Sequence, residues 1–299
     1  MKSSEWTHAL VAQAGLDPAY VDELVRRTIE EDLAGGVDVT SVATVPYDQV
    51  SIARVVTRAA GVVAGLPIAV AVLDAVTEHA VEIDVLCDDG DRVEKGQLLL
   101  TATALTRQLL MAERTLLNLL CHLSGVATMT RQWADALEGT GASVRDTRKT
   151  TPGLRALEKY AVRCGGGLNH RMSLSDAALV KDNHVVAAGG VAAAFAAVRA
   201  TWPELPVEVE CDTLEQVAEA VEAGADLVLL DNMSTDDMRE AVRRTAGRAK
   251  LEASGGLTLK TARAVGATGV DFVAVGALTH SAPILDIGVD LELPPRQKG

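Results

Sequence analysis

The chain has 299 residues, enough for about two domains with a sizeable core. It is acidic, with 28 Lys and Arg against 41 Asp and Glu and a formal net charge of −13, which argues against nucleic acid and anionic membranes as partners. Aromatic residues make up only 3% of the chain, and Ala and Val are abundant. Such small side chains suit strands packed closely against helices.

The cysteines and the N-terminus indicate the compartment. The four cysteines form no Cys-x-x-Cys pair and have no zinc-type spacing, so we interpret them as buried thiols in a reducing cytoplasm: Cys87, Cys121, Cys164 and Cys211. No basic segment followed by an apolar run begins the chain, so no signal peptide is expected. The longest uncharged stretch, 59–73, contains Pro67 and is too short to span a bilayer. We therefore expect a cytoplasmic protein.

The first hundred residues contain helical signals followed by strand signals. Residues 1–40 are expected to form short helices, because apolar residues recur at helical spacing after Pro18, which suits a first helical turn. Residues 51–57, 81–85 and 97–103 are predicted strands, since they are β-branched, alternating or apolar. A long helix is predicted from about 107 to 137, broadly apolar through its leucines.

The segment D-D-G-D-R-V-E-K-G-Q-L-L-L at 88–100 resembles the turn of biotinyl or lipoyl carrier modules. Such modules need an acceptor lysine in an exposed hairpin, commonly flanked by Met. The chain contains no Met-Lys-Met-like tripeptide. We interpret the segment as a related β-sandwich without the carrier chemistry, although a carrier or binding module is the alternative from a different class of protein.

After Gly139 the sequence alternates between strand and helix signals. The predicted strands are 142–146, 178–181, 207–210, 227–230, 250–253 and 272–275, and the predicted helices include 214–223 and 235–245. The polar residues ending the later strands are spaced by 21 to 29 residues, which is one β-α unit each: Lys181, Glu210, Asp231, Ser254 and Gly276. A barrel is favoured over an open parallel sheet, because the last two units end in glycine turns typical of a barrel phosphate site.

We therefore predict an incomplete TIM-like β/α barrel with an N-terminal α+β sandwich domain. The predicted boundaries are 1–116 for the sandwich and 117–281 for the barrel. The alternating tail at 284–291 is expected to return to the first domain as a strand, so that 282–299 belongs with it.

Cations gather in the middle of this acidic chain. They lie in D-T-R-K-T-T-P-G-L-R at 146–155, N-H-R at 169–171 and K-D-N-H at 181–184, and in the residues between: Arg145, Arg148, Lys149, Arg155, Arg163, His170, Arg171, Lys181 and His184. Because they sit among Thr, Pro, Gly and Asn rather than along a helix face, a binding site is favoured over a solvated surface. Arg forks and Lys charges match carboxylates and phosphates, so the ligand is expected to be a small polyanion.

These motifs resemble the signature blocks of the quinolinate phosphoribosyltransferase family. The similarity continues in collinear order through G-G-G-L-N-H-R-M-S-L-S-D at 165–176, V-E-V-E-C at 207–211, L-L-D-N-M at 229–233, S-G-G at 254–256 and V-G-A-L-T-H at 275–280. The resemblance covers most of the chain. It implies that quinolinate and phosphoribosyl pyrophosphate are converted to nicotinate mononucleotide, pyrophosphate and CO2, in the de novo synthesis of NAD.

The resemblance also implies roles for individual residues. Arg148, Arg171 and Lys181 are expected to bind quinolinate, and Lys149 to reach the phosphoribosyl end. Arg114 is expected to reach quinolinate across a homodimer interface, although from the sequence alone it resembles a helix-surface charge. Thr147 and His170 complete the predicted cationic pocket, where His170 is either a proton donor or an anion ligand.

The acidic strand ends and glycine turns are expected to serve the other substrate. Carboxylates at the ends of consecutive barrel strands indicate active-site groups, and the resemblance implies that Glu210 and Asp231 contact the ribose hydroxyls and the magnesium-bound pyrophosphate, with Lys149 as the third catalytic residue. The alternative for the two acids is helix N-capping. Magnesium is the expected cofactor, carried by the pyrophosphate near these acids, with no protein metal site. Backbone N–H groups suited to the 5′-phosphate are predicted in the turns: Ser254, Gly255, Gly256, Val275, Gly276 and Ala277.

Two readings of the pocket stay open. Lys181 ends a strand and could form a Schiff base in a barrel lyase, which would require a desolvated lysine. A relative of this family with another substrate, such as its molybdenum-linked homologues, is disfavoured by the full set of cations for two carboxylates. His184 is equally consistent with an anion contact and with a structural hydrogen bond.

Overall fold

The computed structural model describes residues 2–294, which form two compact units. Unit 1 contains the described residues up to Thr128, together with Ala156–Gly165 and those from Ala282 onward. Unit 2 contains Met129–Arg155 and Gly166–Ser281. The division falls after Thr128, later than the predicted one at residue 116, and a single continuous helix, α5 (Thr106–Leu137), runs through both positions.

Unit 1 begins with helices whose starts follow from their capping residues. Helix α1 (Glu5–Gln13) is capped by Ser4, and α2 (Pro18–Leu33) is capped by Asp17 with Pro18 in the first turn, as the sequence predicts. A short helix α3 (Val39–Thr44) follows. Sequence analysis did not predict α4 (Leu66–Val76), because all of its residues are buried and all except Asp74 are apolar, which leaves no amphipathic pattern.

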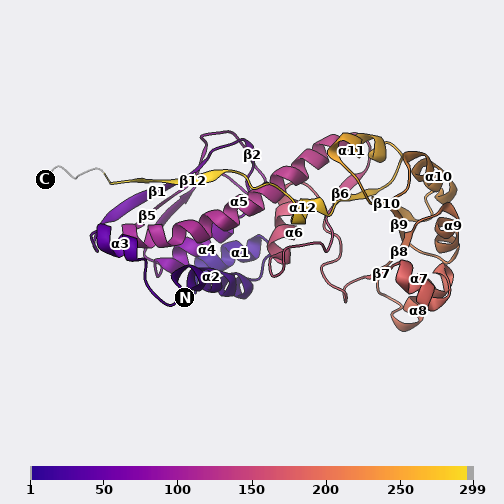
Figure 1. Ribbon diagram of the computed structural model, residues 1–299, viewed down its shortest axis with the longest axis horizontal. Helices are drawn as coiled ribbons and strands as arrows, with labels where there is room; N and C mark the ends of the chain where they lie inside the picture. Colours follow the sequence, from indigo (N-terminus) through magenta and orange to yellow (C-terminus); the bar gives the residue numbers. More distant parts are fainter. Residues whose placement is uncertain (1, 295–299) are drawn as a thin grey trace. The chain divides into compact units, whose positions relative to one another are not determined.

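The main sheet of unit 1 is antiparallel, in the order β12-β1-β5-β3. Its strands are β1 (Val50–Thr57), β3 (Glu82–Val85), β5 (Leu98–Leu105) and β12 (Ile287–Glu292), while β2 (Gly61–Val62) pairs with β4 (Arg92–Val93). Strand β12 pairs with β1 across more than two hundred residues of sequence, with Ile287 opposite Thr57 (Figure 1). The predicted return of the C-terminal segment to the first domain is therefore confirmed.

Unit 2 is built on a parallel sheet in the order β6-β11-β10-β9-β8-β7. The strands are β6 (Ser143–Arg145), β7 (Ala178–Val180), β8 (Val207–Cys211), β9 (Leu227–Asp231), β10 (Lys250–Ser254) and β11 (Phe272–Ala274). Strands β6 and β7 end the order without pairing to each other, so this is an incomplete barrel, as predicted.

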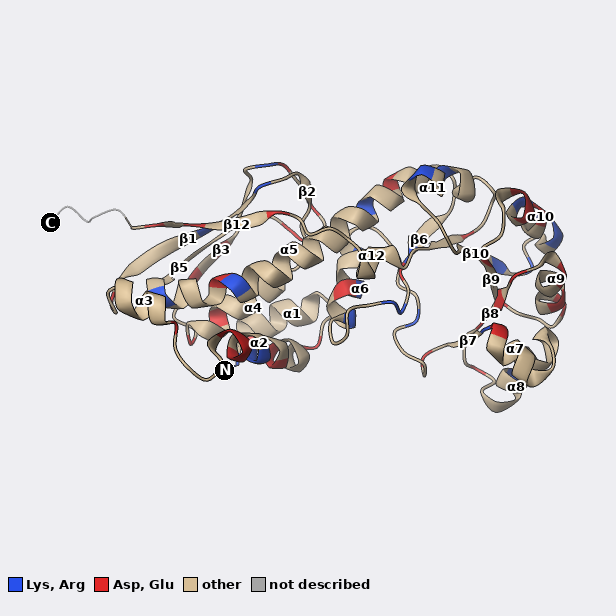
Figure 2. Ribbon diagram, in the orientation of Figure 1, with Lys and Arg blue, Asp and Glu red and all other residues tan. Residues whose placement is uncertain are grey.

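Helices connect and cover the strands of this barrel (Figure 1). They are α7 (Asp182–Ala188), α8 (Val191–Thr201), α9 (Leu214–Glu222), α10 (Thr235–Thr245), α11 (Leu259–Gly266) and α12 (Ala277–His280). Figure 2 shows that α9 carries acidic residues and α10 residues of both signs. The chain between β6 and β7 includes α6 (Arg155–Cys164), most of which belongs to unit 1.

The parallel arrangement positions the site. The carboxyl ends of all parallel strands meet at one edge of the sheet, so the polar residues that end β8, β9 and β10 converge there. Within residues 2–294, no single helix is long and apolar enough to cross a membrane; one bent pair, α7 with α8, passes on length and composition alone.

Candidate active site

A cavity of about 420 Å³ opens in unit 2 at the carboxyl ends of the barrel strands. Most of the side chains predicted for the site line it: Thr147, Arg148, Lys149, His170, Arg171, Lys181, Glu210, Asp231 and Ser254. Sequence analysis did not single out four further lining residues: Leu179, Leu229, Glu252 and Ala274. Motifs that lie far apart in the sequence thus line one cavity, and the roles of their residues stay predictions.

A fully buried aspartate joins two of these motifs. Asp146 follows β6, and its carboxylate accepts hydrogen bonds from the backbone N of His170 (2.7 Å) and from Nδ2 of Asn169 (2.6 Å). In the adjoining turn, the backbone N of Lys149 donates to Oγ1 of Thr147 at 3.0 Å. Asp146 thereby fixes the His170 loop beside the turn that carries Arg148 and Lys149.

Two arginines in the cavity, Arg148 and Arg171, form no ion pair with any carboxylate in the part of the chain that the structure describes. Nε of Arg148 is buried and has no hydrogen-bond partner among the described residues. Nη1 of Arg171 donates only to a backbone carbonyl, that of Ala177, at 2.7 Å. Burial, followed by the charge of Arg148, lowers the pKa of Arg171. Two partly desolvated cations that repel each other are arranged to receive an anion.

An ion pair lies across the same cavity. Nζ of Lys181 is 2.5 Å from Oε2 of Glu210, and their side chains are 46% and 13% exposed. Lys181 comes directly after β7, and Glu210 belongs to β8. A partly exposed pair can exchange partners when a charged ligand enters, because neither charge is committed to a buried network.

The helix caps decide between two interpretations of the acidic strand ends. Helix α10 is capped by Ser234, whose Oγ accepts from the backbone N of Asp237, and α9 is capped by Thr213. Neither Asp231 nor Glu210 therefore caps the helix that follows it. Both carboxylates face the cavity instead, which favours a role in binding or catalysis.

The glycine turns follow β10 and β11, next to the cavity. Gly255 has φ +90°, and a Cβ there would lie 2.2 Å from Oδ1 of Asn232, so only glycine fits. A Cβ on Gly276 would lie 3.0 Å from Cδ of Lys149. Of the residues predicted in these turns, only Ser254 lines the cavity; the phosphate role of the others stays a prediction: Gly255, Gly256, Val275, Gly276 and Ala277.

Several other predicted cations lie elsewhere. Arg114 lies on α5 in unit 1, where its side chain is 61% exposed and Nη2 is 3.2 Å from Glu113; its role across a dimer stays a prediction. Arg163, also in unit 1, donates to the carbonyl of Ala14. Arg155 donates to the carbonyl of Met172. Nδ1 of His184 accepts from the backbone N of Lys181 at 2.9 Å, so this histidine makes the structural hydrogen bond.

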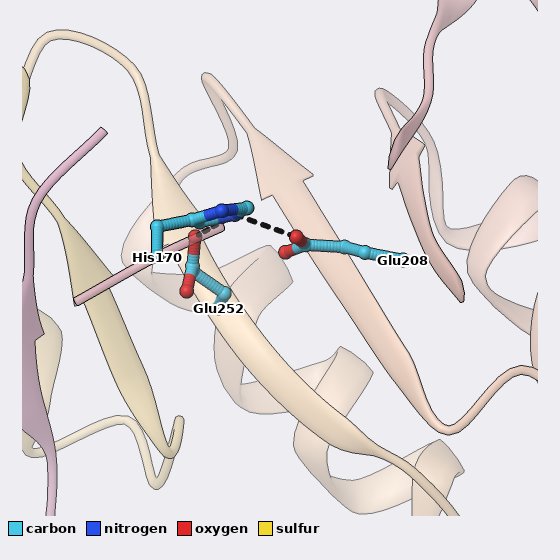
Figure 3. Close-up of side chains that lie close together, drawn as sticks. All are labelled: His170, Glu208 and Glu252. Atoms are coloured by element: carbon cyan, nitrogen blue, oxygen red, sulfur yellow. Dashed lines mark ion pairs between the residues drawn. The ribbon is translucent and has the colours of Figure 1, made fainter. Parts of the chain in front are cut away.

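Two of the lining residues, His170 and Glu252, belong to an ionic cluster that we call the floor cluster: Arg145, His170, Glu208 and Glu252. Figure 3 shows His170 between the two carboxylates. Its Nε2 is 2.7 Å from Oε2 of Glu208 and 3.5 Å from Oε1 of Glu252. Nη1 of Arg145 is 2.6 Å from Oε2 of Glu252. Burial, followed by the charge of Glu208, raises the pKa of Glu252 to about 7.

Sequence analysis missed the acidic half of this cluster, although a signal was present. Glu208 and Glu252 each stand two residues before a strand-ending residue of the site, Glu210 and Ser254. Side chains two apart on a strand point to the same side, so both acids had to face the barrel interior. Arg145, one of the cations predicted to gather at the binding site, instead donates to Glu252.

The four cysteines are free thiols. Cys121 and Cys211 are buried, as predicted, whereas Cys87 and Cys164 are only half-buried. Burial raises the pKa of Cys211 to about 12, and burial also raises that of Cys87, to about 11, so neither is an activated thiolate.

Fold and site together define a class of protein: a barrel enzyme whose cationic cavity receives a small polyanion beside two carboxylates and two glycine turns. Comparison with known proteins identifies the family within this class. The N-terminal domain model of quinolinate phosphoribosyl transferase matches residues 38–124, and the C-terminal domain model matches 126–290. The chain belongs to the quinolinate phosphoribosyltransferase family, as its motifs indicated.

Individual relatives agree with this assignment. A nicotinate-nucleotide pyrophosphorylase (carboxylating) from Mycobacterium leprae is 53% identical over 90% of this chain and 96% of its own length. A probable nicotinate-nucleotide pyrophosphorylase (carboxylating) from Bacillus subtilis is 40% identical over 91% of this chain and 93% of its own. The crystal structure of NadC from Streptococcus pyogenes superposes with a TM-score of 0.90 at 39% identity, covering 94% of this chain and 99% of that one.

Proposed function

We propose that the unit 2 cavity binds quinolinate and phosphoribosyl pyrophosphate and joins them to form nicotinate mononucleotide, releasing pyrophosphate and CO2. The observation that carries the proposal is the placement of Arg148, Arg171 and Lys181 around one cavity, with Nε of Arg148 buried and unpaired. Quinolinate carries two adjacent carboxylates, which match such a set of cations.

The quinolinate end of the cavity is assigned to the cations. Arg148 and Arg171 bind the carboxylates with their guanidinium groups, and Lys181 adds a point charge after releasing Glu210. Thr147 and His170 shape the pocket, since Thr147 supports the turn of Lys149 and His170 is anchored through its backbone by Asp146.

The phosphoribosyl end is assigned to Lys149, Glu210 and Asp231. When pyrophosphate leaves, the ribosyl carbon becomes oxocarbenium-like, and carboxylates beside it stabilise the developing positive charge. Magnesium enters with the pyrophosphate, and the oxygen donors of Glu210 and Asp231 are of the kind it prefers. The turns that follow β10 and β11 are assigned to the 5′-phosphate: Ser254, Gly255, Gly256, Val275, Gly276 and Ala277.

The final step follows from the chemistry of the product ring. N-ribosylation makes the ring nitrogen cationic, so the electron pair left on the neighbouring carbon when CO2 departs is stabilised by that charge. The protein's contribution is to hold the two reactants in line and to exclude competing water, which is mostly positioning.

The direct test mixes the protein with quinolinate, phosphoribosyl pyrophosphate and Mg2+ and measures nicotinate mononucleotide by chromatography. Arg148→Met, which removes the charge, is expected to lower kcat/KM by at least tenfold. Arg239→Met is the matched control, because Arg239 lies on α10 and pairs with the exposed Asp236. Absence of product from the unmodified protein would contradict the proposal.

The Schiff-base alternative is disfavoured by the surroundings of Lys181. A Schiff-base lysine needs desolvation, whereas Lys181 is nearly half exposed and ion-paired. Borohydride added with substrate is expected to leave no adduct on Lys181 in a mass spectrum. A covalent adduct there would revive the lyase interpretation.

We also propose that the enzyme is a cytoplasmic homodimer in which Arg114 completes the partner's site. The exposure of Arg114 on α5 leaves its guanidinium available to a second chain. Mixing inactive Arg114→Ala and Lys149→Ala proteins should then restore activity, because a hybrid dimer can contain one site free of both changes. Failure after demonstrated subunit exchange would place the action of Arg114 within its own chain or rule it out.

A further inference from the structure

The side chain of Arg171 adjoins open space on more than one side. Besides the site cavity of about 420 Å³, it lines a cavity of about 470 Å³ and another of about 280 Å³. Protein interiors normally hold a side chain in one rotamer by close packing against its neighbours. Packing alone therefore does not fix the guanidinium of Arg171, and its hydrogen bonds decide where it points.

Arg171 is held at two points by hydrogen bonds. Its Nη1 donates to the backbone carbonyl of Ala177 at 2.7 Å. Its backbone N donates to Nδ1 of His170 at 2.7 Å, and the backbone N of His170 donates in turn to the buried carboxylate of Asp146. The chain before Arg171 is thus fixed, whereas the position of the guanidinium depends on the carbonyl of Ala177, which lies six residues further on.

One carboxylate fixes the loop that carries this carbonyl. Oδ2 of Asp176 accepts from the backbone N of Met172 at 2.7 Å, and Oδ1 accepts from the backbone N and the Oγ of Ser173 at 2.8 and 2.9 Å. Burial raises the pKa of Asp176, but these hydrogen bonds outweigh it and lower the pKa to about 2, so the group is an ionised acceptor at neutral pH. The three bonds close residues 172–176 into a ring, which the carbonyl of Ala177 directly follows.

The ring closed by Asp176 lies at the surface of unit 2. Met172 and Leu174 are 40% and 69% exposed, and Asp176 is exposed as well. Asp176 lines the 280 Å³ cavity but not the site cavity, so it does not contact a ligand bound in the site. Exposed loops with few buried apolar contacts contribute little to global stability. The effect of the Asp176 hydrogen bonds is therefore expected at Arg171 rather than in the core.

We propose that Asp176 is a positioning residue, which holds the guanidinium of Arg171 toward the site cavity through the loop 172–177. The inference rests on the function proposed above, in which Arg171 binds a carboxylate of quinolinate. Without the ring, the carbonyl of Ala177 loses its fixed place, and the guanidinium can turn into either adjoining cavity. Quinolinate must then restrict the arginine on binding, so its affinity falls, while the phosphoribosyl end of the site is unaffected.

Asp176 also acts on Arg171 through its charge, and this effect has the opposite sign. Burial and the charge of Arg148 lower the pKa of Arg171, and the charges of Glu208 and Asp176 oppose them. Removing an anion beside an anion-binding cation strengthens the attraction for an anionic ligand. Loss of positioning weakens binding instead, so the direction of the change in quinolinate affinity separates the two effects.

The test is steady-state kinetics of the full chain, with each substrate varied in turn at a saturating concentration of the other. Asp176→Ala is expected to raise KM for quinolinate about tenfold to a hundredfold and to leave kcat and KM for phosphoribosyl pyrophosphate unchanged, because the ground state and the transition state lose the same contact. Ser173→Ala loses only the Oγ bond, so its rise in KM should stay below about fivefold. Asp237→Ala is the matched control: this exposed carboxylate on α10 also accepts from a serine three residues earlier, Oγ of Ser234 at 2.6 Å, and its loss should leave both KM values unchanged.

A double-mutant cycle distinguishes positioning from general damage to the site. The Kd of quinolinate is measured by calorimetry for Arg171→Met alone and for Arg171→Met combined with Asp176→Ala. The second change should add nothing, because no guanidinium is left to position. Asp176→Asn, which keeps one acceptor oxygen, protects the test against misfolding and should have an intermediate KM for quinolinate.

Three results would overturn the inference and leave the proposed function standing: tighter quinolinate binding by Asp176→Ala, an equal rise of both KM values, or a full additional loss of affinity in the double variant. The same holds if Ser173→Ala and Asp176→Asn both keep the quinolinate KM of the unmodified protein. No nicotinate mononucleotide from the unmodified protein would overturn the proposed function, and the inference with it.

Discussion

The barrel contains two sets of charged side chains, which differ in burial and in the part we expect them to play in the protein. At the mouth, Lys181 and Glu210 form a pair in which the lysine is nearly half exposed. In the floor cluster, the side chains of Arg145, Glu208 and Glu252 are 14%, 4% and 0% exposed. Exposed pairs contribute little to stability and can change partners, whereas buried charges are fixed by the cost of leaving one unpaired.

The comparison indicates a division of labour. A charged ligand can compete directly with either partner of the Lys181–Glu210 pair at the mouth, because water already weakens the attraction between them. The floor cluster reaches the cavity through His170 and Glu252, and its other two members, Arg145 and Glu208, do not line that cavity. Variants of the floor should therefore alter stability and pH dependence, and variants of the mouth should alter turnover.

The largest loss of stability is expected when the buried ion pair of the floor cluster is removed. Arg145→Ala leaves Glu252 without its cation and should destabilise the barrel by about 3–5 kcal/mol, as for other broken buried ion pairs. Urea unfolding measures this loss. Arg239→Ala, which breaks an exposed pair on α10, should cost less than about 1 kcal/mol. Equal losses for the two variants would contradict the contrast between floor and surface.

At the mouth, Asp231→Asn should act on chemistry alone. Loss of one electrostatic contact to the developing ribosyl charge is expected to lower kcat by about 10²–10³-fold, with kcat/KM falling alongside and quinolinate affinity unchanged. The melting temperature should hold, because Ser234 caps α10. Ser234→Ala is the matched control: it should cost about 1 kcal/mol of stability and keep its turnover. Earlier melting of Asp231→Asn with normal turnover would assign Asp231 a structural role instead.

The floor should also make stability depend on pH. Because the folded pKa of Glu252 lies above its unfolded value of 4.5, its stabilising contribution is complete below about pH 4.5 and is lost as the pH rises to about 7. A shift of this size corresponds to roughly 3 kcal/mol. Unfolding free energies at pH 5 and 8 should therefore differ less in Glu252→Gln than in the unmodified protein. An unchanged difference would mean that Glu252 is ionised across this range.

The smallest effect on stability is expected at the mouth pair. Glu210→Gln removes one partner of Lys181 and should change the unfolding free energy by less than about 1 kcal/mol, because solvent reaches the lysine. Its kcat should nevertheless fall, since Glu210 is assigned to the ribosyl centre. A stability loss as large as that of Arg145→Ala would remove the distinction between mouth and floor.

Much of the fold could be predicted from local pattern. The β-α rhythm after Gly139 located every barrel strand, because each strand is a short apolar run ending in a polar residue. Among the elements that were not predicted, the helices α4 and α6 each have a specific cause. Helix α4 is buried on all sides and so has no amphipathic period. Helix α6 buries Glu158 and Lys159 in unit 1, which its charged sequence conceals.

The part of the candidate site that lies in the sequence motifs was predicted. Cations in loops and acids at strand ends show in the sequence because they interrupt apolar runs. The partnership of Arg145 with Glu252 could not be predicted, since 107 residues separate them and nothing local fixes which strands adjoin. The family resemblance indicated the two substrates. Which residues cap α9 and α10 could be seen only in the structure, where the caps are Thr213 and Ser234 rather than Glu210 and Asp231.

The most direct test of the account compares quinolinate with nicotinic acid as substrates for the unmodified protein. Nicotinic acid has a single carboxylate and would leave one of the cations Arg148, Arg171 and Lys181 unpaired, at a cost of about 2–5 kcal/mol. We therefore predict that kcat/KM for quinolinate exceeds that for nicotinic acid by more than about thirtyfold. Comparable values for the two acids would contradict a pocket built for two carboxylates.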